Sequence, residues 1–307
     1  HGFFKERSVS DAPQTTMVSR RPLPFGRPLP LRPLGLTTRA SGAQTYADGY
    51  NDSLALVGLT HERYLTMDPA AQSIYSAMTF ASVSAETKYY RVTENADGAS
   101  QSGEPVTEEI SAEQYALETR NGQPGCELLL ETPTLSEKAQ TTSWITMTTR
   151  LTKGAEDRWV LCADVTSLDS AGGAAWDATD VIALQVGSQC TMIENSEYLH
   201  RYRRFFSPKM GIAEVRNDYP DVQVRAGIGF AAYYNIQKEE RDHSVYFIVA
   251  LTTSNTEATM VDGYSYYARR ELETVPNISI GTAEGLSISP SNLWKRISAG
   301  HVQLEVN

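Results

Sequence analysis

The chain has 307 residues, of which 41% are hydrophobic and 21% are charged, and its formal net charge is −10. This length suits one large β domain or two small ones, and the apolar content is sufficient for a buried core. No apolar run approaches the roughly 18 residues of a membrane-spanning helix, so we expect no membrane span.

Charge is unevenly distributed along the chain. Residues 1–39 contain seven Lys or Arg and two acidic residues, so this segment carries +5 and the remainder carries −15. A basic tail on an acidic body predicts contact with a polyanion or an acidic neighbour; the alternative is a leader whose arginines only keep it soluble. The start at His1, without an apolar stretch in residues 1–20, indicates that an upstream segment was removed.

Residues 20–36 read RRPLPFGRPLPLRPLGL, with five prolines, four arginines and five leucines. Proline fixes φ and removes a backbone donor, so we expect an extended, polyproline-like segment that packs against its own domain or a neighbouring subunit. A plain linker or an SH3-type ligand is the alternative. The residues predicted to form an inter-subunit arm are Arg20, Arg21, Phe25, Arg27, Leu29, Leu31, Arg32 and Leu34.

Two short helices are predicted from their capping signals. Asp68 before Pro69 indicates a helix over residues 68–78, because Asp is a good N-cap and Pro suits the first helical position. Ser111 and Gln114 have the spacing of a capping box, which predicts a second helix over residues 111–119.

Most of the remaining chain has the pattern of β-strands. Strands are expected at residues 87–94, 126–131, 145–151, 158–165, 181–186, 222–236, 244–253 and 264–271. Residues 145–151 alternate with period two and should form a hairpin with 158–165, and residues 222–236 should form a second hairpin with 244–253. The predicted fold is all-β: an extended arm over residues 1–45, then an eight-stranded antiparallel jelly-roll sandwich over 46–307 with short connecting helices.

The sequence predicts no catalytic residue, cofactor or metal site. It lacks the Gly-rich phosphate loops, the GxSxG motif and the HExxH motif, and its five histidines are scattered singly. One alternative starts from His1-Gly2-Phe3, which resembles the mature start of copper-dependent polysaccharide monooxygenases. That resemblance implies a secreted copper enzyme that uses the N-terminal histidine.

Two groups of side chains have both a structural interpretation and an interpretation as a binding site. Four acidic residues, Asp164, Asp169, Asp177 and Asp180, are close in sequence, and we expect a solvated acidic loop in preference to a calcium site. The cysteines Cys126, Cys162 and Cys190 are odd in number and widely spaced, so we expect buried reduced thiols and a reducing compartment.

One basic cluster interrupts the acidic body. Arginine interleaved with aromatic residues suits single-stranded nucleic acid or a protein interface; a structural loop with buried aromatics is the alternative. The residues predicted to make such contacts are Arg201, Tyr202, Arg203, Arg204, Phe205 and Phe206.

The stretch from Phe25 to Asp68 resembles the N-terminal arm of one major capsid subunit in picorna-like viruses of insects and algae. Gly26, Arg27 and Pro28 match a Gly-aromatic-x-x-Pro element, although Phe25 precedes the glycine here. The second element, an Asp-x-Ser-x-x-Leu-x-Leu segment after a Gly/Asp/Asn-rich stretch, is matched by Asp48, Gly49, Asn51, Asp52, Ser53, Leu54 and Leu56. The resemblance covers about 45 residues.

The resemblance implies a non-enzymatic jelly-roll subunit of an icosahedral virion, released from a polyprotein and assembled in the host cytoplasm. Its partners would be other copies of itself, sister capsid subunits and genomic RNA on the inner face, without a membrane. A non-viral β-sandwich module that binds carbohydrate or mediates adhesion is the main alternative.

Overall fold

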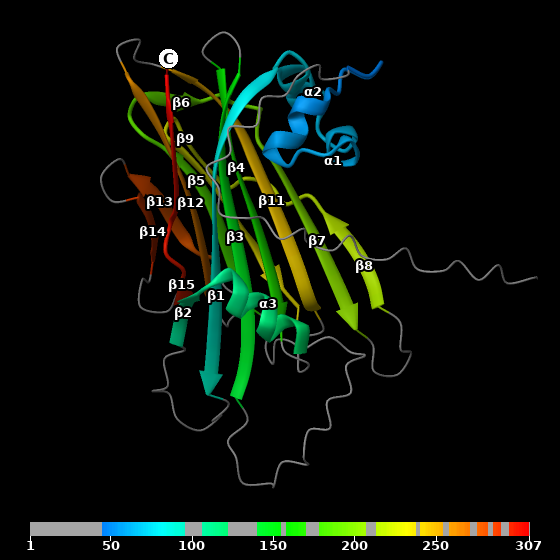
Figure 1. Cartoon of the computed structure of the whole chain (residues 1–307), viewed down its shortest axis with the longest axis vertical. Helices are drawn as coiled ribbons and strands as arrows, with labels where there is room; N and C mark the ends of the chain where they lie inside the picture. The colour runs from blue at the N-terminus through cyan, green and yellow to red at the C-terminus, as the bar shows by residue number, and fades with distance from the viewer. Residues whose placement is uncertain are drawn as a thin grey trace, which may run out of the picture. The chain divides into compact units, whose positions relative to one another are not determined.

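The computed structural model describes eleven stretches of the chain (Figure 1). They are residues 45–95, 106–121, 140–154, 158–169, 178–206, 213–237, 240–253, 258–270, 275–281, 285–289 and 295–306. The chain divides into two units, residues 1–33 and 34–307, and every described residue belongs to the second. The arm residues Arg20 to Leu34, the strand predicted at 126–131 and Cys126 therefore lie outside the described residues. No helix in the described stretches is both long and apolar enough to cross a membrane.

Three short helices precede the first strand: η1 (Asp52–Val57), α1 (His61–Leu65) and α2 (Pro69–Ser76), which we call the N-terminal cap. The predicted helix at 68–78 is confirmed as α2. The Asp68 carboxylate accepts a hydrogen bond from the Ala70 amide at 2.8 Å, and Pro69 occupies the first helical position. The Thr60 hydroxyl caps α1 in the same way, 3.2 Å from the Arg63 amide.

The larger sheet has the strand order β2-β1-β3-β4-β11-β7-β8. Its strands are β1 (Phe80–Asn95), β2 (Val106–Ile110), β3 (Gln140–Gly154), β4 (Arg158–Asp169), β7 (Tyr198–Phe206), β8 (Ala213–Asp218) and β11 (Glu240–Thr253), and β6 (Cys190–Met192) also pairs with β11. The second predicted helix is confirmed as α3 (Ala112–Asn121), which follows β2. Its Ser111 cap accepts from the Gln114 amide at 3.1 Å.

The smaller sheet has the order β15-β12-β5-β10-β9. Its strands are β5 (Ala178–Val186), β9 (Val224–Ala226), β10 (Gly229–Ile236), β12 (Met260–Arg270) and β15 (Lys295–Arg296), and β16 (Gly300–Glu305) also pairs with β12. A separate hairpin is formed by β13 (Asn277–Gly281) and β14 (Gly285–Ser289). The strand pairs described in both sheets are antiparallel, so the predicted all-β sandwich is confirmed at this level.

The apolar residues form layers. The main core lies between the two sheets and includes Trp159, Phe247 and Phe230. A second cluster lies under the N-terminal cap, where Tyr75 packs with side chains of β4 and β11. The β13–β14 hairpin covers a third cluster on β5 and β10. Because β5 and β11 are covered on both faces, their sequences read as nearly continuous apolar runs.

One predicted hairpin is confirmed and the other is wrong. Residues 145–151 and 158–165 lie in β3 and β4, which pair as expected. Residues 222–236 instead contain β9 and β10, joined by the turn at Gly227 and Ile228, and they belong to the smaller sheet. Strand β11 lies between β4 and β7 in the larger sheet. Buried apolar strands have the same local pattern whichever sheet they join. The closeness of these two strands in sequence therefore did not indicate that they pair.

Candidate functional site

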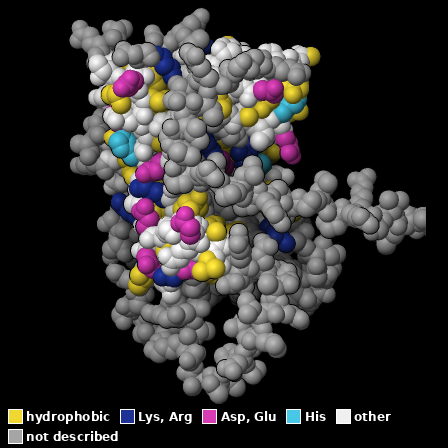
Figure 2. Space-filling view, in the orientation of Figure 1, with side chains coloured by type: hydrophobic (Ala, Val, Ile, Leu, Met, Phe, Trp, Pro, Cys, Tyr) yellow, Lys and Arg dark blue, Asp and Glu magenta, His cyan; other side chains and the backbone are white. Residues whose placement is uncertain are grey.

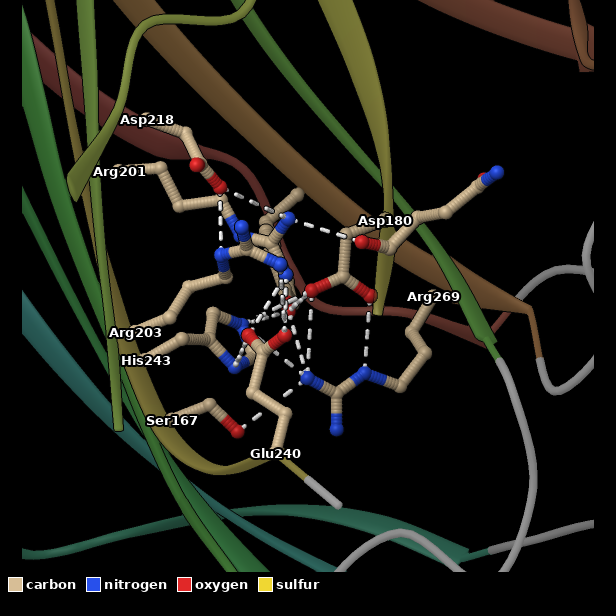
Figure 3. Close-up of polar contacts among 10 residues, drawn as sticks. Ser167, Asp180, Arg201, Arg203, Asp218, Glu240, His243 and Arg269 are labelled. Carbon is tan, nitrogen blue, oxygen red and sulfur yellow. Dashed lines mark hydrogen bonds and ion pairs between the residues drawn. The ribbon is translucent and has the colours of Figure 1, made fainter. Parts of the chain in front are cut away.

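Ionisable side chains meet in the interior between the two sheets (Figure 3). The larger sheet contributes Arg201 and Arg203 of β7 and Glu240 and His243 of β11, and the smaller sheet contributes Asp180 of β5 and Arg269 of β12. We call this set the inter-sheet ion network.

Asp180 is the fully buried centre of one half of the network. Its carboxylate accepts from Arg269 Nε at 2.9 Å and from Arg269 Nη2 at 3.2 Å, and His243 Nε2 lies 3.0 Å away. The Tyr267 hydroxyl donates to the same carboxylate. Burial alone would raise the pKa of Asp180, but the charge of Arg269 and the hydrogen bonds from His243 and Arg269 hold it well below its usual range. Asp180 therefore stays ionised inside the sandwich.

Glu240 is the fully buried centre of the other half. Arg201 Nη2 lies 2.6 and 2.7 Å from its two carboxylate oxygens. Arg201 also donates to the Asn235 carbonyl at 2.8 Å and lies over the Tyr234 ring at 4.5 Å. His243 Nδ1 is 3.6 Å from Glu240 Oε1, so this imidazole lies between the two buried carboxylates.

The arrangement suits a cross-link better than a catalyst. Ser167, His243 and Asp180 are the residue types of a hydrolase triad, but the Ser167 hydroxyl faces Arg269 Nη2 at 3.3 Å and all three side chains are buried. A substrate would have to displace two buried ion pairs, Arg269–Asp180 and Arg201–Glu240, and the His243–Asp180 contact that joins the two sheets. In the described stretches, no group of three or more His, Cys, Asp or Glu side chains is arranged to hold a metal ion.

The basic cluster predicted at Arg201–Phe206 is strand β7 rather than a loop. Arg201 is 3% exposed and paired with Glu240, and Arg203 pairs with Asp218 at 2.5 Å, so both guanidinium groups are paired with carboxylates of the same chain. Phe205 is buried, whereas Tyr202 and Arg204 are partly exposed. A nucleic-acid or interface role stays a prediction for the cluster, with Tyr202 and Arg204 as its accessible members; the side chain of Phe206 lies outside the described set.

The expectation of an acidic loop is wrong for Asp164, Asp169 and Asp180, which lie on strands β4 and β5, and Asp177 lies outside the described residues. Asp164 lies on β4, where its carboxylate contacts Arg150 at 2.9 Å and Arg63 at 3.5 Å. Asp180 lies in the network on β5, in which all nine residues are buried. One sequence signal was available, since a single carboxylate within the apolar run ATDVIALQV requires a buried partner. The partner itself was not predictable, because Arg269 is 89 residues away.

A row of hydroxyl and amide side chains crosses the outer face of the larger sheet. Strand register places one residue from each of six neighbouring strands in line. The row is Tyr89, Thr146, Thr166, Ser244, Tyr202 and Asn217. It runs between two helical elements on the same face, the N-terminal cap and α3, which contacts Tyr89 through Tyr115. Figure 2 shows mixed acidic and basic side chains around α3, where Arg91 pairs with Glu108 and Glu118.

No protein-family model matches the chain, and no curated protein matches its sequence. Several solved structures are similar to part of it. The collagen-binding subdomain of the Enterococcus faecalis surface protein ACE has a TM-score of 0.29 and 8% identity, over 50% of this chain and 90% of that chain. The collagen-binding domain of RspB from Erysipelothrix rhusiopathiae has a TM-score of 0.27 and 7% identity, over 54% and 65%. A collagen-binding domain of a Staphylococcus aureus adhesin has a TM-score of 0.24 and 8% identity, over 38% and 79%. TM-scores this low assign neither a topology nor a function.

Proposed function

We propose that this chain is a non-catalytic jelly-roll subunit that assembles with copies of itself and with sister subunits into an icosahedral virus shell. The strand order supports the jelly roll. An eight-stranded roll pairs its first strand with its eighth, its second with its seventh, its third with its sixth and its fourth with its fifth. If β4 is the second strand and the three-residue strands β6 and β9 are left out, the third to eighth strands in chain order are β5, β7, β8, β10, β11 and β12.

Three of the four expected pairs are present under this numbering. They are β4 with β11, β5 with β10, and β7 with β8. The position beside β12, where the first strand would lie, is taken by the C-terminal strand β16. Strands β1 and β3 instead extend the larger sheet beyond β4. The proposal therefore includes a jelly roll with a replaced first strand.

Assembly of the purified full chain tests this proposal. We expect closed, uniform shells by electron microscopy and a large particle by analytical ultracentrifugation. Deleting residues 1–40, which include the proline-rich arm, should abolish assembly and leave the β-sandwich folded. A monodisperse full-length monomer at high protein concentration would overturn the shell proposal.

The second candidate is a β-sandwich module that binds carbohydrate or another protein. The hydroxyl row favours this candidate, because partly exposed hydroxyl groups in register offer aligned donors and acceptors to a polyhydroxylated chain.

Binding of the monomeric protein to an oligosaccharide array tests the second candidate. The double substitution Thr146→Val and Thr166→Val removes two adjacent hydroxyls of the row with little change in volume. The matched control is Thr191→Val, at an exposed position of β6. Loss of binding in the double variant alone supports the module, and absence of binding by the parent protein rejects this version of it.

A further inference from the structure

Strand β8 forms one end of the larger sheet, beside β7 (Figure 1). It pairs with β7 along its whole length, and no strand in the described stretches pairs with its other side. Val215 is 48% exposed, and Arg216 and Asn217 are exposed as well. A strand with one unpaired side presents backbone donors and acceptors to a further strand, so β8 is a candidate for pairing with another chain.

Side-chain contacts with β7 hold β8 in place. Arg203 Nε lies 2.5 Å from the Asp218 carboxylate, and His200 Nε2 lies 3.0 Å from Asn217 Oδ1. The His200 ring also stacks on Tyr219, directly after β8, at 5.3 Å between centroids. A strand that is already extended and fixed loses little conformational freedom when a second strand pairs with it.

The sequence of β8 does not exclude such pairing. Edge strands are commonly protected by proline, by lysine or by charges that repel a partner. Strand β8 contains neither proline nor lysine, and its charged residues are Glu214, Arg216 and Asp218. Opposite charges that face each other across two strands stabilise a sheet and like charges destabilise it, so this pattern decides which partner β8 accepts.

A second copy of β8 matches the pattern in one register. In an antiparallel ladder, two opposite residues either exchange hydrogen bonds or both point away, so two copies of one strand pair about an axis through a single residue position. An axis at Val215 places Glu214 of each copy opposite Arg216 of the other. The two Val215 residues lie opposite each other, and Ala213 lies opposite Asn217.

The other axes that pair three or more residues of β8 are less favourable. An axis at Glu214 or at Arg216 places like charges opposite each other. An axis at Asn217 pairs only residues 216–218 of the strand and uses Asp218, whose carboxylate already binds Arg203. The Val215 axis pairs residues 213–217 without opposing like charges.

We propose that β8 pairs antiparallel with β8 of a second copy of this chain, about a two-fold axis at Val215, and joins the two larger sheets into one. The contact is self-complementary, as a two-fold interface must be. It continues the outer face, with its hydroxyl row, from one copy to the next. The inference does not depend on whether the protein builds shells or binds carbohydrate.

Disulfide cross-linking of the full chain tests the axis. In Val215→Cys, the two new thiols lie at the axis, where opposite Cα atoms are about 4.5–5.5 Å apart and within reach of a disulfide. The matched control is Asn217→Cys, at an exposed position on the same face of β8, whose two copies would lie about 14 Å apart along the strands. Under mild oxidation we expect covalent dimers from Val215→Cys alone. The parent chain gives the background, since its described cysteines, Cys162 and Cys190, are buried.

Charge reversal tests the register independently. Glu214→Arg and Arg216→Glu should each weaken self-association about tenfold in analytical ultracentrifugation, because each change places two pairs of like charges opposite each other. The double variant restores opposite charges and should associate as the parent does.

Three results would overturn the proposal: no cross-link in Val215→Cys, an equal cross-link in Asn217→Cys, or a double variant that associates as weakly as the single ones. Shells that form without the Val215→Cys cross-link would reject the β8 contact and leave the shell proposal standing. Cross-linked dimers that form no shells would support the β8 contact alone.

Discussion

His243 Nε2 lies 3.0 Å from Asp180 Oδ2, and this contact joins a histidine of the larger sheet to a carboxylate of the smaller sheet. Both side chains are buried, so water does not screen the interaction. Such a pair gains little over an apolar core of the same shape, but a lone member is costly. We infer that the inter-sheet ion network helps to select how the two sheets face each other, since a shifted packing would separate His243 from Asp180 and Arg269 from Ser167. The Arg269–Asp180 and Arg201–Glu240 pairs each lie within one sheet and would survive such a shift.

Replacing Asp180 by Asn should destabilise the protein by about 3–5 kcal/mol, because the change leaves Arg269 buried beside a neutral partner. Denaturant unfolding followed by circular dichroism measures this loss. The control is Asp221→Asn at an exposed position, which should change the free energy of unfolding by less than about 0.5 kcal/mol. Equal effects of the two substitutions would contradict the structural role of the network.

The stabilisation from Asp180 should disappear in acid. Its pKa is lowered in the folded state, so the contribution is complete above the unfolded pKa of about 3.9 and is lost as the pH falls toward the folded value. The difference in unfolding free energy between the parent and Asp180→Asn should be constant from about pH 5 to 7 and should narrow below about pH 4. Unfolding curves at several pH values check this, and a gap unchanged down to about pH 2 would refute it.

Tyr75→Phe should cost about 1–2 kcal/mol, because it leaves a buried carbonyl without its donor. The fully buried Tyr75 hydroxyl donates to the Ser196 carbonyl at 2.9 Å and so ties α2 to the segment before β7. Thermal or denaturant unfolding measures the loss. Tyr219→Phe, at a half-exposed ring, is the control and should be nearly neutral.

Gly58→Ala should destabilise the N-terminal cap by about 1–2 kcal/mol through its left-handed backbone alone. Gly58 has φ 79°, and an added Cβ would lie 3.2 Å from both Arg150 Nη1 and Asp164 Oδ2. Gly227→Ala is the matched control, since its Cβ would approach only Thr191 within 4 Å, at 3.7 Å, and its φ is not positive. Unfolding measurements on both variants should separate them; an equal cost would indicate that Gly58 is not constrained.

Short-range signals in the sequence determined the local elements. Asp68 before Pro69 predicted the start of α2, Ser111 predicted the start of α3, and period-two alternation with a turn predicted the β3–β4 pair. These features depend on backbone geometry and capping within a few residues, which is why one sequence suffices to predict them.

Only the tertiary structure decided which sheet each buried strand joins and which charges meet. Strands β10 and β11 are neighbours in sequence but lie in opposite sheets. The sequence could not predict this, because each strand has an apolar pattern that fits any position covered on both faces. Asp180 and His243 are 63 residues apart, and Arg201 and Glu240 are 39 apart. Asp180 and His243 meet because the two sheets pack face to face, whereas Arg201 and Glu240 meet because β7 and β11 are neighbours in the larger sheet. No local pattern encodes either meeting.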